Sequence, residues 1–180
     1  MKIKHITIAA TLALLSATAA QAADVYGGVS LGASRWSVAD QPGFNIDKSD
    51  TGYKLVLGMQ FTPMLGAELG YASLGTAKIS GAGTGEVKGT GWFVDVVGTL
   101  PLSGSLSGFG KLGVFNGKAE ASGAGGVASD SGTDVKYGFG LSYALSKSVD
   151  LRGEWERYRF NLSGDKGDVD LLSVGVNFKF

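Results

Sequence analysis

The two-residue period of the apolar side chains is the feature that most constrains this sequence. It is clearest over residues 53–61. The odd positions there hold Tyr53, Leu55, Leu57, Met59 and Phe61, and the even positions hold Lys54, Val56, Gly58 and Gln60. Because successive side chains of a β-strand point to opposite faces, this alternation is typical of a strand with one apolar face. The pattern favours an all-β fold.

Seven further segments repeat the alternation, so that eight strands are expected. They cover residues 25–33, 65–71, 92–100, 111–114, 137–145, 149–155 and 172–180. Within 92–100, Phe93 and Val97 fall on the polar face and blur the pattern. The long stretch of such segments, with no linker between them, indicates one domain.

The connections between these segments are of two kinds that alternate along the chain. Short ones lie at 62–64, 102–107 and 146–148, and longer ones, rich in Gly, Ser, Ala and Asp, lie near 39–50, 76–89, 119–133 and 161–168. Outer-membrane barrels have short turns on one side of the membrane and longer loops on the other. The spacing therefore predicts an eight-stranded antiparallel up-and-down transmembrane β-barrel.

Residues 1–22 have the three parts of a secretory signal peptide. Lys2 and Lys4 form a basic flank, residues 6–15 are mostly apolar, and residues 20–22 read Ala-Gln-Ala, a small-residue cleavage pattern. A buried N-terminal helix is the alternative. We expect export to the periplasm and a mature barrel domain of residues 23–180. Cleavage would also remove His5, the one histidine, and the sequence has no cysteine.

Charged residues near strand centres indicate which face points inward. The polar faces carry Glu68, Asp95, Lys111, Arg152 and Glu154, interspersed with Gly and Ser. In a soluble barrel this face would lie in water and would carry more charge, whereas only 18% of this chain is charged against about 25% in ordinary soluble domains. The interior of an eight-stranded barrel is just wide enough for side chains. We therefore expect these five residues to form a charge network inside the barrel.

Aromatic residues on the apolar faces lie near the strand ends. The expected interface aromatics are Tyr53, Phe61, Tyr71, Trp92, Tyr137, Tyr143 and Trp155. Membrane barrels carry such girdles at both interfaces, and a sheet in lipid must close because lipid cannot satisfy an open edge. The apolar faces are therefore expected to contact acyl chains. A lipocalin-like periplasmic barrel, with these faces inside, is the alternative.

The end of the chain resembles the C-terminal targeting signal of outer-membrane barrels. This signal would consist of Ser173, Gly175, Phe178 and Phe180. Residues 65–71 and 151–155 are similar to strands of the OmpA transmembrane domain. The resemblance implies a monomeric, largely plugged barrel in a Gram-negative outer membrane, with Glu68 and Arg152 paired in its core. It also implies outer-membrane lipids, lipopolysaccharide and the barrel-assembly machinery as partners, while the family's peptidoglycan-binding domain is not expected after Phe180.

Three patterns that could indicate a dinucleotide, calcium or catalytic site are better explained as ordinary parts of a barrel wall, a loop and a charge network. Residues 108–113 spell G-x-G-x-x-G, but the dinucleotide fingerprint needs a following helix and these residues lie in β pattern. Asp165, Asp168 and Asp170 do not have EF-hand spacing. Asp95 and Glu154 could suggest glycosidase chemistry, but charge compensation by Lys111 and Arg152 explains them better. We expect no cofactor and no metal.

Two functions of different class follow from these patterns. Lipid A deacylases and palmitoyltransferases use this architecture with catalytic histidine, which the mature chain lacks, so no enzyme is expected. Basic and acidic residues balance at 16 each, so no nucleic-acid partner is expected. The first reading is a structural or surface-interaction role, in adhesion or envelope integrity, with an unknown extracellular partner at the loops. The second is a narrow pore or a hydrophobic-ligand conduit.

Overall fold

The computed structural model describes residues 24–37, 44–47, 49–81, 85–123, 126–162 and 165–180. The expected signal peptide lies outside these residues. The described strands are β1 (Asp24–Ser37), β2 (Phe44–Asp47), β3 (Ser49–Thr62), β4 (Leu65–Gly81), β5 (Gly85–Ser103), β6 (Leu106–Gly123), β7 (Gly126–Ala144), β8 (Val149–Leu162) and β9 (Asp165–Lys179). None of these residues lies in a helix long and apolar enough to cross a membrane.

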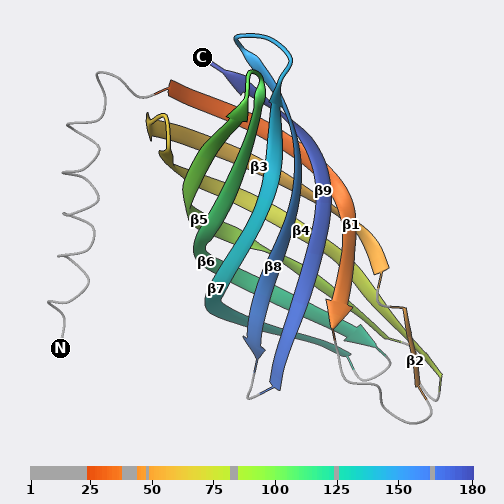
Figure 1. The fold of residues 1–180 in the computed structure, drawn as a ribbon. Coiled ribbons are helices and arrows are strands. Elements are labelled where there is room, and N and C mark those ends of the chain that lie inside the picture. Colours follow the sequence, from red (N-terminus) through yellow and green to blue (C-terminus); the bar gives the residue numbers. More distant parts are fainter. Residues whose placement is uncertain (1–23, 38–43, 48, 82–84, 124–125, 163–164) are drawn as a thin grey trace, which may run out of the picture.

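Eight of these strands close into an antiparallel barrel (Figure 1). Each strand pairs with its neighbours in chain order, and β1 pairs with β9 to complete the ring. The Phe180 N–H donates to the Val25 carbonyl oxygen at 2.9 Å, so the described chain ends beside its first strand. The predicted eight-stranded up-and-down barrel is confirmed.

The two ends of the barrel differ, as the connection lengths predicted. At one end, here called the turn end, short turns join β3 to β4, β5 to β6 and β7 to β8, and the start of β1 and the end of β9 lie there too (Figure 1). Gly104, with φ of 44°, supplies the left-handed residue that the β5–β6 turn requires. The opposite end is here called the hairpin end.

The predicted long loops are wrong at the hairpin end, because most of their residues are strand. β4 continues to Gly81, β5 begins at Gly85, and the β6–β7 ladder extends to the pair Gly123–Gly126. β8 and β9 likewise pair as far as Leu162–Asp165. These segments are rich in Gly, Ala and Ser, so they carry no apolar alternation, but their backbones still form a full ladder. Side-chain pattern alone therefore missed them.

A ninth strand, β2, also lies in a segment that was expected to be loop. It pairs with the outer part of β4, from Phe44–Gly81 to Asp47–Lys78. β4 is irregular just before this part, with a register shift between Ser73 and Thr76. Gly75 there has φ of 74°, and the Thr76 N–H donates to the Asp50 carboxylate at 2.6 Å. This bulge changes the direction of β4, so that its outer part can pair with β2.

The two faces of the wall carry opposite chemistry. Large apolar side chains such as Leu57 (62% exposed) and Leu172 (64% exposed) point away from the barrel, while Glu68 (1% exposed) points into the lumen. The predicted orientation, with apolar side chains outward, is therefore confirmed. Phe93 and Val97, which blurred the alternation, are buried in the lumen rather than misplaced on the outer surface.

Candidate functional site

The middle of the lumen holds a network of buried charges that we call the ionic layer. Its members are Lys54, Glu68, Asp95, Lys111, Lys136, Arg152, Glu154 and Glu156. They come from β3, β4, β5, β6, β7 and β8, because the alternation of each strand places its polar face inward. Four cations face four anions, so the layer is neutral overall.

The ionic layer is organised around carboxylates that each accept from more than one cation. Glu68 lies 2.6 Å from Arg152 Nη1 and 2.6 Å from Lys111 Nζ. Glu154 contacts Lys54 and lies 2.7 Å from Lys111 Nζ. The Glu68–Arg152 pair implied by the resemblance is thus present in the structure. The Tyr26 hydroxyl also donates to Glu68, at 2.6 Å.

Glu156 links Lys54 to the fourth cation, Lys136. Lys54 Nζ lies 2.5 Å and Lys136 Nζ 2.7 Å from its carboxylate, and the Tyr158 hydroxyl donates to it at 3.1 Å. Lys136 also pairs with Asp95. Of the expected charge compensation by Lys111 and Arg152, the part for Glu154 agrees with its contact with Lys111. The part for Asp95 is wrong, because Asp95 pairs with Lys136 instead.

Sequence reasoning missed Lys136 and Glu156 as members of this layer and did not single out Lys54. Lys54 lies on the polar face of 53–61, and Glu156 continues the parity of Arg152 and Glu154. Lys136 has the parity of Gly138 and Gly140 but precedes the first apolar residue of its expected strand. Extending the expected strands 137–145 and 149–155 by two residues at each end would have found Lys136 and Glu156.

Apolar side chains fill the lumen between the ionic layer and the hairpin end. We call this group the apolar plug; it consists of Trp36, Leu74, Phe115, Tyr158, Phe160, Val169 and Leu171. Phe115 packs edge-on against Tyr158 at 4.9 Å between ring centroids and against Phe160 at 5.5 Å. Trp36 stacks on Phe160 at 6.0 Å and donates its indole N–H to the Leu74 carbonyl oxygen at 3.2 Å. The plug is packed like the core of a soluble protein.

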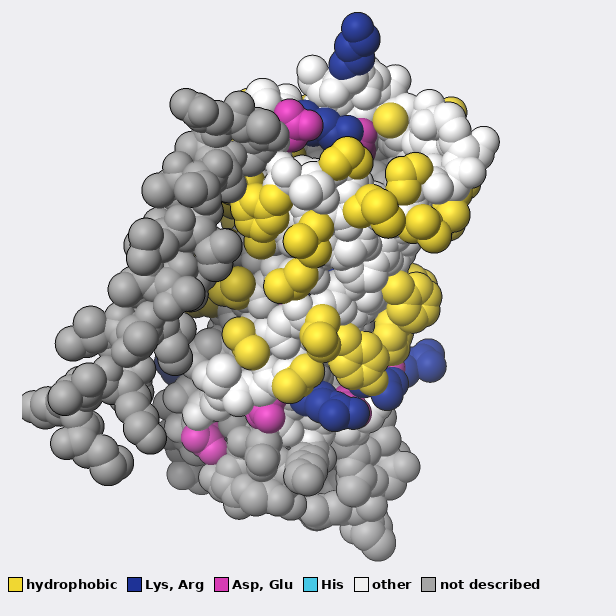
Figure 2. Space-filling model, turned by 60° about the vertical axis from the view of Figure 1, so that its left-hand side comes forward, with side chains coloured by type: hydrophobic (Ala, Val, Ile, Leu, Met, Phe, Trp, Pro, Cys, Tyr) yellow, Lys and Arg dark blue, Asp and Glu magenta, His cyan; other side chains and the backbone are white. Residues whose placement is uncertain are grey.

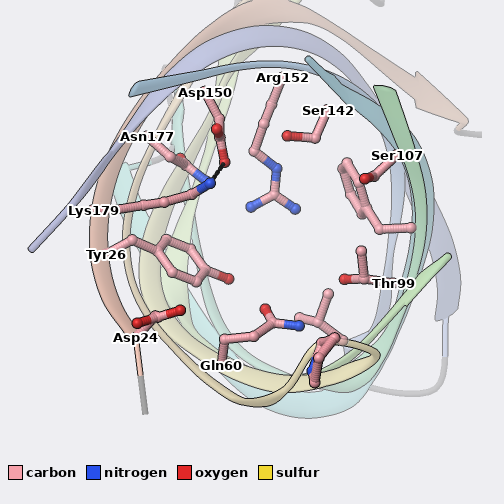
Figure 3. Close-up of a pocket in the computed structure, with 13 residues that line it drawn as sticks. Asp24, Tyr26, Gln60, Thr99, Ser107, Ser142, Asp150, Arg152, Asn177 and Lys179 are labelled. Atoms are coloured by element: carbon pink, nitrogen blue, oxygen red, sulfur yellow. Dashed lines mark ion pairs between the residues drawn. The ribbon is translucent and has the colours of Figure 1, made fainter. Parts of the chain in front are cut away.

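On the other side of the ionic layer, a cavity of about 230 Å³ lies at the turn end (Figure 3). Arg152 projects into it, with its guanidinium 4.0 Å from the centre of the Phe109 ring. Lys179 pairs with Asp150 at 2.7 Å on its wall. Further polar lining comes from Asp24, Tyr26, Gln60, Thr99, Ser107, Ser142 and Asn177. The cavity is therefore a polar space closed on its inner side by the ionic layer.

The outer surface of the barrel carries the expected interface aromatics. Figure 2 shows apolar side chains gathered over the middle of the wall, with charged side chains near both ends. Tyr71 packs edge-on against Trp92 at 5.2 Å, and Tyr137 against Trp155 at 6.0 Å. The other expected aromatics, Tyr53, Phe61 and Tyr143, are exposed on the same surface. Their role as membrane-interface anchors remains a prediction.

The expected targeting signal lies at the end of the last strand, β9, and Phe180 follows its last residue, Lys179. Phe178 and Phe180 point outward and are exposed, while Ser173 and Gly175 face the lumen. Gly175 has its missing Cβ position 2.1 Å from the Ser30 hydroxyl oxygen, so β1 and β9 approach closely there. The motif therefore forms part of the seam that closes the barrel, and its role in targeting remains a prediction.

An ion pair marks the boundary between the apolar surface and the hairpin end. Arg157 donates two hydrogen bonds to the Asp170 carboxylate, at 2.6 and 2.7 Å, and its guanidinium lies 5.4 Å from the Trp155 ring centre. The Arg159 guanidinium lies over the Tyr137 ring, 5.8 Å from its centre.

Among the described residues, no group of three or more His, Asp or Glu side chains could hold a metal ion.

Comparison with known proteins agrees with this architecture. Residues 7–180 match the family described as outer membrane protein beta-barrel domain. The chain is 31% identical to outer membrane protein A of Salmonella typhi and 30% identical to that of Shigella flexneri, in each case over 100% of this chain and 56% of the relative. The chain thus spans about half the length of these relatives. The resemblance to the OmpA transmembrane domain is confirmed.

Solved structures share the fold at lower sequence identity. Neisserial surface protein A matches with a TM-score of 0.64 and 14% identity, over 89% of this chain and 100% of that one. OprG from Pseudomonas aeruginosa matches at 0.58 and 18%, over 88% and 95%. Ail of Yersinia pestis, solved with the heparin analogue sucrose octasulfate, matches at 0.56 and 19%, over 87% and 99%. These likenesses concern the fold.

Proposed function

The chain belongs to the outer membrane protein β-barrel family, and on that premise we propose that it is a non-conducting barrel that interacts with partners through its hairpin end. It is a protein of the Gram-negative outer membrane. In this family the short turns face the periplasm, so the turn end is periplasmic and the hairpin end is outside the cell. The proposal therefore assigns the lumen to stability and the outer surface to function.

The observation that carries this proposal is the apolar plug. Phe115, Tyr158, Val169 and Leu171 are all fully buried, so among the described residues the outer half of the lumen is filled. An ion crossing it would have to leave water for a packed apolar layer, which costs far more than thermal energy. The ionic layer lies next to the plug, and its charged side chains are paired with one another, so they also block the lumen. A conduit would need both layers to rearrange.

The hairpin end supports a surface role because it extends well beyond the apolar wall. We call the segments 44–47, 76–81, 85–90, 116–123 and 126–135 the outer sheet. On β6 the outward side chains change from Leu112 and Val114 to Asn116, Lys118 and Glu120. This change of polarity marks the point where the sheet leaves the lipid. The outer sheet then presents a broad polar surface to the medium.

The charge of the hairpin end does not favour a sulfated ligand such as the one bound to Ail. The basic residues of its described strands are Arg35, Lys78, Lys88, Lys118, Arg157, Arg159 and Lys166, and the acidic residues are Asp47, Asp50, Glu86, Glu120, Asp130, Asp134, Asp165, Asp168 and Asp170. Recognition of a polysulfate needs a basic patch, and here acids outnumber bases. The proposed partner is therefore a protein surface.

Shortening the outer sheet tests the proposal. Replacing residues 120–129 by Asn-Gly would close a tight hairpin on the pair Ala119–Asp130 and keep the plug residues. We expect expressing cells to lose attachment to protein-coated surfaces, while the folded and boiled forms still differ in gel mobility. The control, Lys118→Gln, removes an exposed ion pair but keeps the sheet, and should attach normally. Unchanged attachment by the shortened variant would contradict the proposal.

A narrow pore is the second candidate, and the turn-end cavity is the observation that favours it. Arg152 stands between this cavity and the rest of the lumen. If the lumen conducts, Arg152→Ala should raise single-channel conductance in planar bilayers. We expect both the native chain and this variant to stay silent, because the apolar plug blocks the outer half in each. Conductance in either would favour the pore.

A further inference from the structure

We propose that the turn-end cavity binds a small zwitterion, a molecule with a carboxylate beside an ammonium group, and that Arg152 holds the carboxylate. The inference goes beyond the proposed function, because it concerns the periplasmic end of the lumen and not the outer sheet. Two buried groups of opposite charge line this cavity without all the hydrogen-bond partners that they need. These groups belong to Arg152 and Asp150.

The Arg152 guanidinium uses only part of its hydrogen-bonding capacity. Its Nη1 donates to Glu68 at 2.6 Å, and this is the one hydrogen bond that it donates to a described residue. Its Nε is buried and has no partner among those residues. Nε and Nη2 lie side by side in a guanidinium and form a fork of two donors. Because a buried charged donor without an acceptor is costly, this fork favours an acceptor inside the cavity.

Arg157, on the same strand, shows what such a fork binds. Its Nε and Nη2 donate to the two oxygens of the Asp170 carboxylate, at 2.6 and 2.7 Å. The spacing of the two donors matches the spacing of the two carboxylate oxygens, which makes the pair bidentate. Arg157 is on the outer face of β8 and Arg152 on the inner face. The same fork on Arg152 therefore fits a carboxylate that enters the lumen.

The wall presents the Arg152 fork to the cavity. Figure 3 shows Arg152 reaching from the wall toward the middle of the lumen. The Phe109 ring covers one face of the guanidinium, at 4.0 Å, and such stacking leaves the N–H groups in the plane free to donate. In the register of the sheet, Arg152 has Ser142 on one side and Gly175 on the other. These small neighbours leave room for a ligand beside the fork.

Asp150 provides the matching acceptor. It pairs with Lys179 through Oδ2, at 2.7 Å, whereas its Oδ1 is buried without a hydrogen bond in the part of the chain that the structure describes. Asp150 and Arg152 lie two residues apart on β8 and both line the cavity, so their Cα atoms are about 6.6 Å apart. A ligand with a donor next to its carboxylate can therefore reach both side chains.

The charges and the size of the cavity narrow the class of ligand. Its described charged lining groups are Asp24, Asp150, Arg152 and Lys179, two of each sign. A dianion such as phosphate would therefore bring charges that the lining does not compensate. A zwitterion is neutral overall, and its two groups match Arg152 and Asp150. The volume of about 230 Å³ is smaller than the roughly 300–1,000 Å³ of pockets for drug-sized molecules, so the ligand is small.

The test follows the arginine Nε–H signals of the full chain in detergent micelles by ¹⁵N NMR. The sequence has four arginines. Arg35→Lys, Arg157→Lys and Arg159→Lys assign three signals, and the fourth belongs to Arg152. We expect alanine to shift the Arg152 signal in a saturable manner and to leave the Arg157 signal in place, because that fork already binds Asp170.

Two relatives of alanine and two inorganic anions test the specificity. Propionate lacks the ammonium group and alaninamide lacks the carboxylate, so each should bind at least about tenfold more weakly than alanine. An unchanged Arg152 signal with alanine would mean that the cavity holds water only and would overturn the proposal. An equal effect of chloride or phosphate would reveal an adventitious ion only, with the same consequence.

A substitution on the opposite wall locates the binding. Thr99→Phe places a ring in the cavity without removing the Arg152–Glu68 pair, whereas Leu100→Phe places the same ring on the outer surface of β5. We expect at least about a tenfold loss of alanine affinity for Thr99→Phe and none for Leu100→Phe. Native affinity in Thr99→Phe, with the folded and boiled forms still different in gel mobility, would refute the site.

Asp150→Asn tests the second half of the site. It keeps the size of the side chain but removes the charge that faces the ammonium group, so the preference for alanine over propionate should fall to less than about threefold. An unchanged preference would contradict the role of Asp150. These binding measurements do not depend on cell attachment, so the surface role and this site can fail separately.

Discussion

Two adjacent layers of the lumen, the ionic layer and the apolar plug, fill the same barrel with opposite chemistry. In the ionic layer every charged group depends on particular partners, as Lys136 depends on Asp95 and Glu156. In the apolar plug, rings such as Phe115 and Phe160 depend on shape. The difference teaches that a lumen can be closed by neutralised charge or by packing, and that the two should respond differently to substitution.

The position of each layer follows from what the wall allows. Long charged chains need room, and the wall provides it with lumen-facing glycines such as Gly113 and Gly138. The missing Cβ of Gly113 would meet Asp95 Oδ1 at 2.3 Å, and that of Gly138 would meet the Glu156 side chain at 2.8 Å. These glycines therefore occupy places where only a hydrogen atom fits beside the charged chains.

Glu156→Ala is expected to have the largest effect, because it leaves two buried ammonium groups short of a partner. Removing one member of a buried ion pair costs about 3–5 kcal/mol. Urea unfolding of the barrel in lipid vesicles measures the loss in free energy of unfolding. Glu120→Gln, which breaks an exposed pair with Lys118, is the control and should change stability by less than about 1 kcal/mol. Similar losses in both would mean that burial does not set the strength of the ionic layer.

Phe115→Ala tests the apolar plug and should cost about 3 kcal/mol in the same measurement. The cost arises because the ring packs against Tyr158 and Phe160 and leaves a cavity when removed. Phe115→Leu keeps most of the volume and should cost less than about 1.5 kcal/mol. A large loss with Leu would show that the plug, like the ionic layer, needs specific geometry, and would weaken the contrast between the two.

Two glycine substitutions compare the crowded lumen with the open outer surface. A Cβ at Gly70, which faces the lumen, would meet Phe93 Cζ at 2.3 Å and the Leu55 carbonyl oxygen at 2.4 Å. A Cβ at Gly98, on the outer surface, would meet nothing within 4 Å. Gly70→Ala should therefore cost about 1–3 kcal/mol and Gly98→Ala less than about 0.5 kcal/mol. Equal effects would indicate that the crowding near Phe93 relaxes without cost.

Arg157→Gln should have a smaller effect than Glu156→Ala, Phe115→Ala or Gly70→Ala, because its pair with Asp170 is partly exposed to solvent. We expect a loss of about 0.2–1 kcal/mol in the free energy of unfolding, decreasing as NaCl is raised. Asp170→Asn should give a similar loss and a similar salt dependence. A loss as large as that of Glu156→Ala would place this pair with the buried charges instead.

Much of the barrel could be predicted from alternation. The eight strands and their orientation follow from segments such as 53–61 and 172–180, where lipid-facing and lumen-facing side chains must differ. The hairpin end could not be predicted in this way, because the side chains of 119–133 are small on both faces and carry no signal. β2 was missed for a further reason: its four residues depend on the bulge at Gly75 for a partner.

The sequence by itself therefore determined the class of fold, which end carries short turns and which residues point inward, because these depend on each strand alone. Only the tertiary structure decided that Asp95 pairs with Lys136, that Phe115 packs against Tyr158 and Phe160, and that the outer half of β7 has one strand neighbour among the described strands. Those features depend on the register between strands and on how the closed wall tilts, which brings together residues distant in the chain. A periodic pattern contains no information on either.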